Sequence, residues 1–172
     1  MITTHIFKCW NGPAPTTAAQ ASVTTGTVIK TMLQLSTPSS RQLSVIAWGF
    51  SSDDPPGADG VIELIQTNVA ATGGTAHVAA GVQPLDPNAP ASLLTLGTGN
   101  TGYSFTAEGA ITATRTFDTV SLSSTSGESP LAYTYQFMPD ERPIVAISSF
   151  LRVRATTPTT ALDLRTWILF QE

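Results

Sequence analysis

The chain has 172 residues, of which 41% are hydrophobic and 12% are charged, and its formal net charge is −4. This length suits a single domain, and the charged fraction is well below the usual ~25%. Lys8 and Lys30 are the only lysines, so the sequence offers no basic stripe for phosphates and excludes nucleic acid as a direct partner. Thr and Ser must cover much of the surface, and this composition favours strands over helices.

The cysteine content and the hydropathy pattern limit where the protein works. Cys9 is the single cysteine, which excludes an internal disulfide and any dependence on an oxidising compartment. The first ten residues do not form a secretion signal, and no run of about 18 apolar residues occurs that would span a membrane. We therefore expect a soluble protein that is made and used without secretion and has no membrane partner.

Short apolar runs recur along the whole chain, separated by clusters of Pro, Gly, Ser and Asp. This rhythm predicts an all-β fold, a jelly-roll-like antiparallel β-sandwich of about ten short strands. The expected strands are residues 2–10, 27–36, 42–50, 61–67, 76–82, 103–107, 110–116, 119–123, 131–137, 144–156 and 162–170. Residues 17–23 are rich in Ala but too short to hold a helix alone.

Side-chain alternation assigns faces to the last two strands. Leu151 and Val153 point one way, so Arg152 and Arg154 are expected to share the opposite, outer face. Residues 162–170 are apolar on both faces, which indicates a strand that is central to the sandwich or covered by another copy of the chain.

One glycine-rich segment matches a nucleotide-binding pattern. Residues 97–102 read Gly-x-Gly-x-x-Gly and follow an apolar run. A dinucleotide site needs a helix N-terminus directly after the glycines. Tyr103-Ser-Phe-Thr follows instead, which is typical of a strand, so we expect a glycine-rich turn and no cofactor.

Metal ligands are scarce. A zinc site needs three or four ligands, and His5, His77 and Cys9 are the whole inventory of His and Cys. On one strand His5 and Cys9 would lie about 13 Å apart, too far to share a metal. The acidic segment 53–60 lacks the spacing of a calcium loop and is expected to be a solvated hairpin loop. We expect no metal.

Candidate catalytic groups are equally sparse. Glu63 and Glu108 are the strand-associated acids that a glycosidase pair would use, yet nothing in the sequence places them together, and each is expected to face outward. The Gly-x-Ser-x-Gly elbow is missing, and a Ser-His-Asp triad would have to use His5 or His77. We therefore expect a protein that is not an enzyme, with no catalytic residue.

Residues 1–172 are expected to form one β-sandwich domain whose beginning needs its own explanation. Residues 11–26 have neither helical nor strand periodicity and are rich in Pro, Ala and Thr. Residues 1–26 are therefore either an N-terminal arm that reaches across a protein–protein boundary or a segment packed along its own domain as an ordered loop.

Packing and turn motifs occur in five segments. They are residues 8–15 (KCWNGPAP), 29–34 (IKTMLQ), 46–50 (IAWGF), 76–81 (AHVAAG) and 150–154 (FLRVR). Through them the chain resembles a group of small structural proteins encoded beside head genes in tailed bacteriophages. The resemblance implies a capsid decoration, or cement, protein: a β-rich module, commonly a homotrimer, that sits on the outer shell and clamps neighbouring major-capsid subunits.

On this resemblance we expect a structural virion protein that is made in the host cytoplasm and located on the capsid exterior. Its partners would be copies of itself, with a trimer favoured, and the major capsid protein. The alternative is a phage tail or fibre module that binds a carbohydrate receptor, for which Trp10, Trp48 or Trp167 would line a groove. A small hydrolase or isomerase on a jelly-roll scaffold is the third reading.

Overall fold

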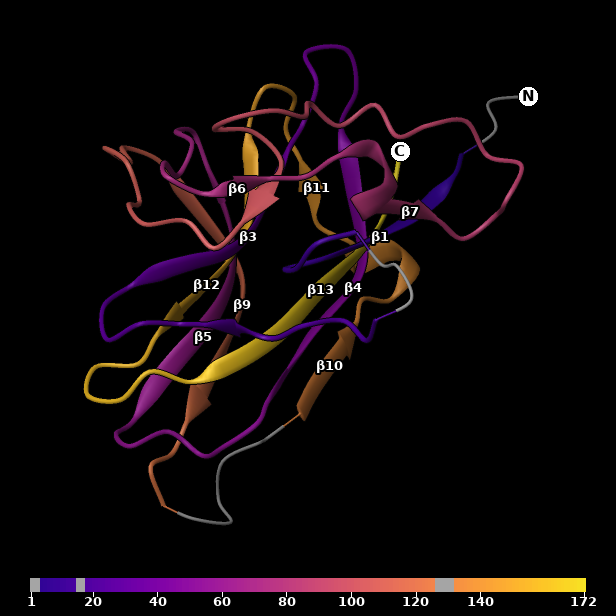
Figure 1. Cartoon of the computed structure of the whole chain (residues 1–172). Helices are drawn as coiled ribbons and strands as arrows, with labels where there is room; N and C mark the ends of the chain where they lie inside the picture. The colour runs from indigo at the N-terminus through magenta and orange to yellow at the C-terminus, as the bar shows by residue number, and fades with distance from the viewer. Residues whose placement is uncertain (1–3, 15–17, 126–131) are drawn as a thin grey trace.

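The computed structural model describes residues 4–14, 18–125 and 132–172 (Figure 1). Thirteen strands in these residues form two antiparallel sheets packed against each other, so the expected all-β sandwich is confirmed. Sheet A contains β1 (Ile6–Trp10), β2 (Val23–Thr24), β4 (Leu43–Ser52), β7 (Val82–Pro84), β10 (Ala132–Gln136), β11 (Ile144–Val145) and β13 (Asp163–Gln171). Sheet B contains β3 (Lys30–Ser36), β5 (Gly60–Thr67), β6 (Thr75–Ala76), β8 (Gly102–Tyr103), β9 (Thr114–Leu122) and β12 (Phe150–Thr156).

The main strands follow the order of a jelly roll. In sheet A the order is β10-β4-β13-β1, with β7 beyond β1, and in sheet B it is β3-β12-β5-β9. Strands from the two halves of the chain alternate in both sheets, because β13 lies between β1 and β4 and β12 lies between β3 and β5. Such interleaving arises when two Greek keys wind together. The described residues add two short 3-10 helices, Ala79–Gly81 and Pro139–Glu141.

One expected pair of strands is a single strand in the structure. Residues 110–116 and 119–123 were predicted separately, yet β9 (Thr114–Leu122) contains the end of the first range and most of the second. Phe117 is an extra residue in β9 where the register shifts against β5, so β9 bulges and continues. A bulge breaks the alternation of side chains, which explains why the sequence indicated two strands.

Two other expected strands are divided. Residues 76–82 contain the end of β6, a 3-10 helix and the start of β7. Residues 144–156 contain β11 and β12, separated by Ser148, whose φ of 50° lies in the left-handed region. These divisions account for much of the difference between thirteen strands and the expected ten.

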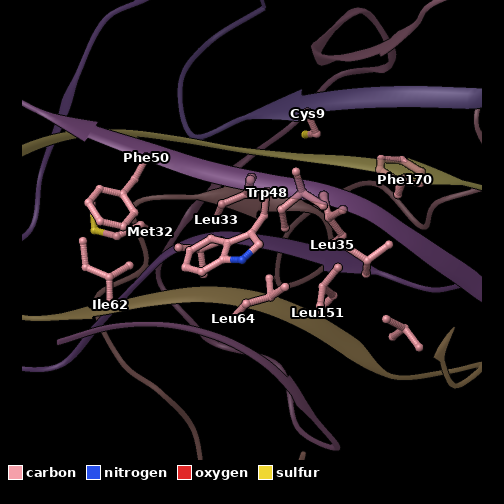
Figure 2. Close-up of a cluster of buried hydrophobic side chains, with 14 of the residues drawn as sticks. Cys9, Met32, Leu33, Leu35, Trp48, Phe50, Ile62, Leu64, Leu151 and Phe170 are labelled. Carbon is pink, nitrogen blue, oxygen red and sulfur yellow. The ribbon is translucent and has the colours of Figure 1, made fainter. Parts of the chain in front are cut away.

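The core lies between the sheets and is centred on Trp48 (Figure 2). This indole of sheet A is fully buried, and the figure shows Leu33 and Leu64 of the facing sheet B beside it. Close packing of this kind stabilises the fold mainly by removing apolar surface from water. Trp48 is therefore a core residue and is not available to line a receptor groove.

The last strand occupies the centre of sheet A. Leu164, Ile168 and Phe170 of β13 are fully buried, whereas Trp167 and Leu169 on the other face are only partly exposed. The expectation for residues 162–170 offered two explanations, and the structure shows the first of them: β13 is central, with β4 on one side and β1 on the other.

The described part of residues 1–26 packs along its own domain. β1 lies inside sheet A between β13 and β7, and β2 pairs with β13. Farther along, the carbonyl of Gln20 accepts a hydrogen bond from Arg165 Nε (3.1 Å). The described residues of this segment are thus held against their own domain, and an arm that reaches across to another chain stays a prediction.

Asn11 joins this connection to the centre of the sheet. Its amide donates to the carbonyl of Leu164 (2.9 Å) and its Oδ1 accepts from the N–H of Thr166 (2.8 Å), so the side chain continues the ladder where β1 ends. Asn11 is fully buried. We expect Asn11→Ala to lower the free energy of unfolding by about 1–3 kcal/mol, because two buried backbone groups lose their partners.

Urea denaturation measures this effect, with Asn88→Ala as the control because Asn88 is exposed. The control is expected to change the free energy of unfolding by less than about 0.5 kcal/mol. Equal effects of the two substitutions would contradict the role assigned to Asn11.

Candidate functional site

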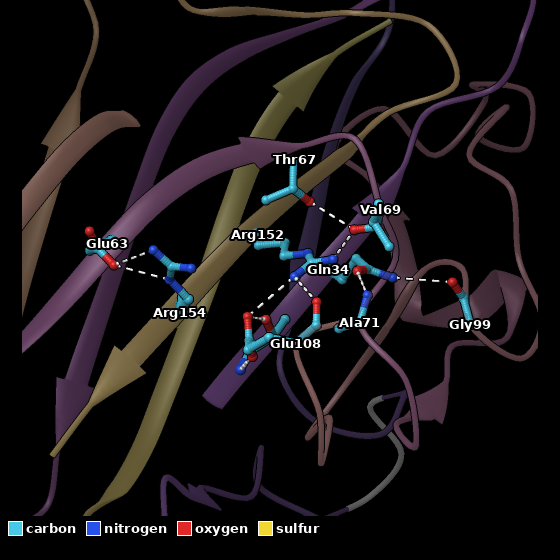
Figure 3. A network of polar contacts seen from close by, with 10 residues as sticks. Gln34, Glu63, Thr67, Val69, Ala71, Gly99, Glu108, Arg152 and Arg154 are labelled. Atoms are coloured by element: carbon cyan, nitrogen blue, oxygen red, sulfur yellow. Dashed lines mark hydrogen bonds and ion pairs between the residues drawn. The ribbon is translucent and has the colours of Figure 1, made fainter. Parts of the chain in front are cut away.

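A network of polar contacts lies on the outer side of sheet B (Figure 3). Arg152 donates from Nη1 to Glu108 Oε2 (3.2 Å) and to the Glu108 carbonyl (3.1 Å), and from Nη2 to the carbonyl of Val69. The Glu108 carboxylate also accepts from the N–H (2.6 Å) and the hydroxyl (2.9 Å) of Thr31. The network clamps two irregular segments onto β3 and β12.

Arg152 and Arg154 share the outer face of sheet B, as expected, but Arg152 does not reach solvent. Arg152 is fully buried because the segments that carry Val69 and Glu108 fold over it, and burial lowers its pKa. Arg154 is partly exposed and pairs with Glu63 (2.9 Å). Glu108 is half-buried instead of facing outward freely, and each of the two glutamates is held by its own arginine.

Gln34 also holds irregular segments against the outer side of sheet B. Its Oε1 accepts from the N–H of Ala71 (2.8 Å), and its Nε2 donates to the carbonyls of Asn100 (2.7 Å) and Gly99 (3.3 Å). Gly97 and Gly99 have positive φ and β8 follows them, so the expected glycine-rich turn is confirmed. These contacts are structural, and they leave no backbone N–H cradle at a helix N-terminus.

The histidines and the cysteine are not gathered around one point. Cys9 is buried in the core, where burial raises the pKa of its thiol. His77 is buried elsewhere: its Nε2 hydrogen-bonds to the carbonyl of Trp10 (2.8 Å), its ring packs on Tyr103, and burial lowers its pKa. Within residues 4–14, 18–125 and 132–172, no three His, Cys, Asp or Glu side chains cluster closely enough to hold a metal ion.

The acidic segment 53–60 does not form a hairpin. It connects β4 of sheet A to β5 of sheet B and therefore crosses from one sheet to the other, which corrects the expected hairpin loop. Asp53 pairs with Arg165 (2.7 Å), and Asp59 accepts from the N–H and hydroxyl of Ser124 (2.9 Å each). These hydrogen bonds lower the pKa of the exposed Asp59 carboxyl.

Two tryptophans lie side by side on the outer face of sheet A. Trp10 of β1 is directly opposite Trp167 of β13, with ring centroids 6.2 Å apart, and Lys8 Nζ lies 4.5 Å and 4.1 Å from the two ring centroids. Trp167 in turn covers Gly49 of β4, where an added Cβ would lie 2.8 Å from the indole. Only glycine fits beneath the ring. The aromatic pair is partly exposed, so it could stack on a flat ligand.

A hollow of about 580 Å³ opens at one end of the sandwich. Its lining comes from several separate segments, including the start of β4 and the end of β13, and we call it the end hollow. Ile144 and Ile147 are 44% and 48% exposed there, and Arg41 and Glu172 supply charge. Residues this far apart in the sequence gave no signal of a shared site, because only the pairing of strands brings them together.

One carboxylate ties the two sheets together beside their adjoining edges. Asp118 of β9 accepts hydrogen bonds from Trp48 Nε1 (2.9 Å) and from the hydroxyl of Tyr133 on β10 (2.8 Å). Burial, together with the Asp118 carboxylate, raises the pKa of Tyr133 to about 12. The phenol therefore stays a hydrogen-bond donor at neutral pH. The sequence did not indicate this bridge, since Asp118 lies next to the bulge at Phe117.

None of the helical segments in the described part of the chain has the length and apolar character of a membrane span. Comparison with protein-family models, with curated proteins and with solved structures found no match to this chain. The surfaces of the jelly roll itself are therefore the basis for assigning a function.

Proposed function

We propose that this chain is a structural virion protein, a capsid decoration protein that binds copies of itself and neighbouring major-capsid subunits on the exterior of a phage head. The observation that carries the proposal is the apolar lining of the end hollow. Ile144 and Ile147 in that hollow are two of the ten large apolar side chains that are exposed in the described residues. Exposed apolar side chains in a surface hollow are typical of a protein–protein contact.

The fold and the charge support the same proposal. Jelly rolls occur in viral capsid and lectin domains, although a fold alone does not determine a function, so this support is by analogy. Low charge allows many copies to pack closely on a shell without strong repulsion. The proposal includes no catalysis, and both glutamates considered for a glycosidase pair, Glu63 and Glu108, are engaged by arginines.

A second candidate function is a tail or fibre module that binds a carbohydrate receptor. The observation that favours it is the pair Trp10 and Trp167 on the outer face of sheet A, because sugar rings stack on aromatic faces. Lys8 already lies against both rings, so a sugar would have to use the part of each indole that Lys8 leaves uncovered.

Binding to capsids that lack this protein tests the contact surface. We expect the double variant Ile144→Asp/Ile147→Asp to bind at least about tenfold more weakly, because two carboxylates would be desolvated in an apolar contact. The matched control is Val28→Asp. Val28 is 70% exposed and lies just before the start of β3, at the end of that strand that is away from the end hollow. Cosedimentation with the capsids measures the binding of each variant.

Electron microscopy of labelled virions separates the two candidate functions. Label on the outer shell of the head supports decoration, whereas label on tails or fibres contradicts it and favours the receptor module. A second pair of results would also overturn the proposed function. Glycan binding would be lost in Trp10→Ala/Trp167→Ala, and both this variant and Ile144→Asp/Ile147→Asp would still bind capsids.

A further inference from the structure

β10 forms an open edge of sheet A. It pairs with β4 on one side, and no other strand of the described residues pairs with it on the other side. Figure 1 shows β10 at the margin of the sandwich. An unpaired edge presents a row of free N–H and C=O groups, which is a template for another strand.

The hydrogen bonds to β4 show which backbone groups point outward. The N–H of Phe137 donates to the carbonyl of Ile46 (2.9 Å), and the Tyr133 carbonyl lies against Gly49 of β4. In an antiparallel ladder both backbone groups of a residue point the same way, and the direction alternates along the strand. Odd-numbered residues therefore bond to β4, and Ala132, Thr134 and Gln136 present their N–H and C=O groups to the open side.

The other sheet margins are protected in ways that β10 is not. β7 ends at Pro84, which has no N–H, and β6 has only two residues. β9 bulges at Phe117 and turns the charge of Asp118 toward the other sheet. These are common devices against unwanted pairing. β10 reads AYTYQ, without charge, proline or bulge, and Tyr and Thr favour strands.

The flanks of this edge are apolar. Tyr135 is 40% exposed and Met138, just after β10, is 65% exposed; Ile144 of β11, which pairs with β4 farther along the same edge, is 44% exposed. A partner that pairs with β10 would cover these side chains as well as the free backbone groups, so hydrogen bonding and apolar burial act together at this edge.

We propose that β10 pairs antiparallel with β10 of a second copy of this chain, about a two-fold axis through Thr134. Thr134 would face Thr134 of the second copy, and Ala132 would face Gln136, so a small residue meets a long one. About six backbone hydrogen bonds would form. Because the strand is uncharged, no like charges oppose each other despite a net charge of −4 on each chain.

This inference rests on the self-association in the proposed function and names the strand that carries it. A contact between identical strands has two-fold symmetry and joins two copies. The pair of chains, rather than the trimer that the resemblance implies, is therefore the unit that this edge supports. Sheet A would continue across the axis, with the tryptophan pair of each copy on the same extended face.

Thr134→Pro tests the pairing, because proline removes an outward N–H that β4 does not use. We expect the wild-type chain to show a dimer mass by light scattering at micromolar concentration and Thr134→Pro to show half that mass, with a melting temperature within about 4 °C of the wild type. Thr134→Val, which keeps the N–H, is the matched control and should remain a dimer.

Three results would overturn the edge pairing. A dimer that survives Thr134→Pro shows that another surface joins the copies. A trimer that survives it overturns the pairing while leaving the proposed decoration function standing. A wild-type monomer overturns the pairing and also the self-association in the proposed function, although capsid binding is still decided separately by cosedimentation.

A disulfide tests the register. In the proposed pair the Thr134 Cα atoms would lie about 5.5 Å apart, within reach of a disulfide. We expect Thr134→Cys to form covalent dimers when copper phenanthroline and oxygen accept the two electrons and two protons of the thiol pair. The native Cys9 is buried and should not react, and Thr119→Cys on β9 is the control that should remain uncrosslinked. A dimer without this crosslink would show that the register is wrong.

Discussion

Deletion of residues 166–172 is expected to leave a chain that does not fold cooperatively. These residues form most of β13, which pairs with β4 on one side and β1 on the other. Their loss would uncover both neighbours in the middle of sheet A and remove the fully buried Ile168 and Phe170. Each of these side chains contributes roughly 1.5–3 kcal/mol by burial, and domains of this size are stable by only about 5–15 kcal/mol.

Circular dichroism during thermal unfolding measures the effect of this deletion. Leu169→Ser is the control, because Leu169 lies on the outer face of the same strand and is only partly buried. The control should unfold cooperatively and close to the wild type, whereas the deletion should show no cooperative transition. A sharp transition at an unchanged temperature in the truncated chain would contradict the central position of β13.

Arg152→Leu is expected to lower the free energy of unfolding by about 3–5 kcal/mol, the usual cost of breaking a buried ion pair on one side. The substitution leaves Glu108 half-buried without its charge partner, removes the donor of the Glu108 carbonyl, and leaves the Val69 carbonyl with the Thr67 hydroxyl as its remaining donor. The segments that Arg152 clamps onto sheet B should also exchange their amide hydrogens faster.

Arg154→Leu is the matched comparison for Arg152→Leu. Arg154 forms an ion pair with Glu63 on the same face, but its side chain is 16% exposed whereas that of Arg152 is 0% exposed. Within the described residues the hydrogen bonds of the Arg154 side chain go to Glu63 alone, so its loss leaves no backbone carbonyl without a donor. We expect a loss of at most about 1 kcal/mol in urea denaturation. A loss at Arg154 as large as that at Arg152 would show that burial does not decide the energetics of this face.

The double variant Arg152→Leu/Glu108→Leu separates the ion pair from the packing around it. In the double variant no unpaired charge remains on this face from the Arg152–Glu108 pair. We therefore expect the double variant to be more stable than Arg152→Leu alone. If the changes in the free energy of unfolding caused by the two single substitutions simply added up in the double variant, the two charges would have no coupling energy. Arg152 would then hold the irregular segments through packing alone.

The sequence predicted the fold class and the long strands because these depend on local patterns. β3 and β4 are buried along most of their length, and β5 and β13 bury roughly every second side chain; the expected ranges of all four overlap the observed strands closely. The glycine-rich turn at residues 97–102 was likewise predicted, since the strand-like residues after it excluded a helix.

The features that the sequence did not predict depend on contacts between distant residues. Arg152 was expected outside because alternation reports only the side of a sheet and not what covers it, and its partner Glu108 lies 44 residues away on an irregular segment. The open edge of β10 and the end hollow depend on strand order. No local pattern reports which strand ends a sheet.

The pairing of β1 with β13 has a consequence for synthesis on the ribosome. Trp10 meets Trp167 and Phe7 meets Phe170, so the earliest strand of the jelly roll pairs along its whole length only with the last, and β7 covers a part of its other side. Folds with such distant contacts fold slowly, in milliseconds to seconds, because the loop between the partners must first be closed. Until residues 163–171 leave the exit tunnel, the nascent chain has a sheet with a gap at its centre. Sheet A is therefore completed only once β13 is available, and a chain stalled before β13 would expose the unpaired sides of β1 and β4 to chaperones.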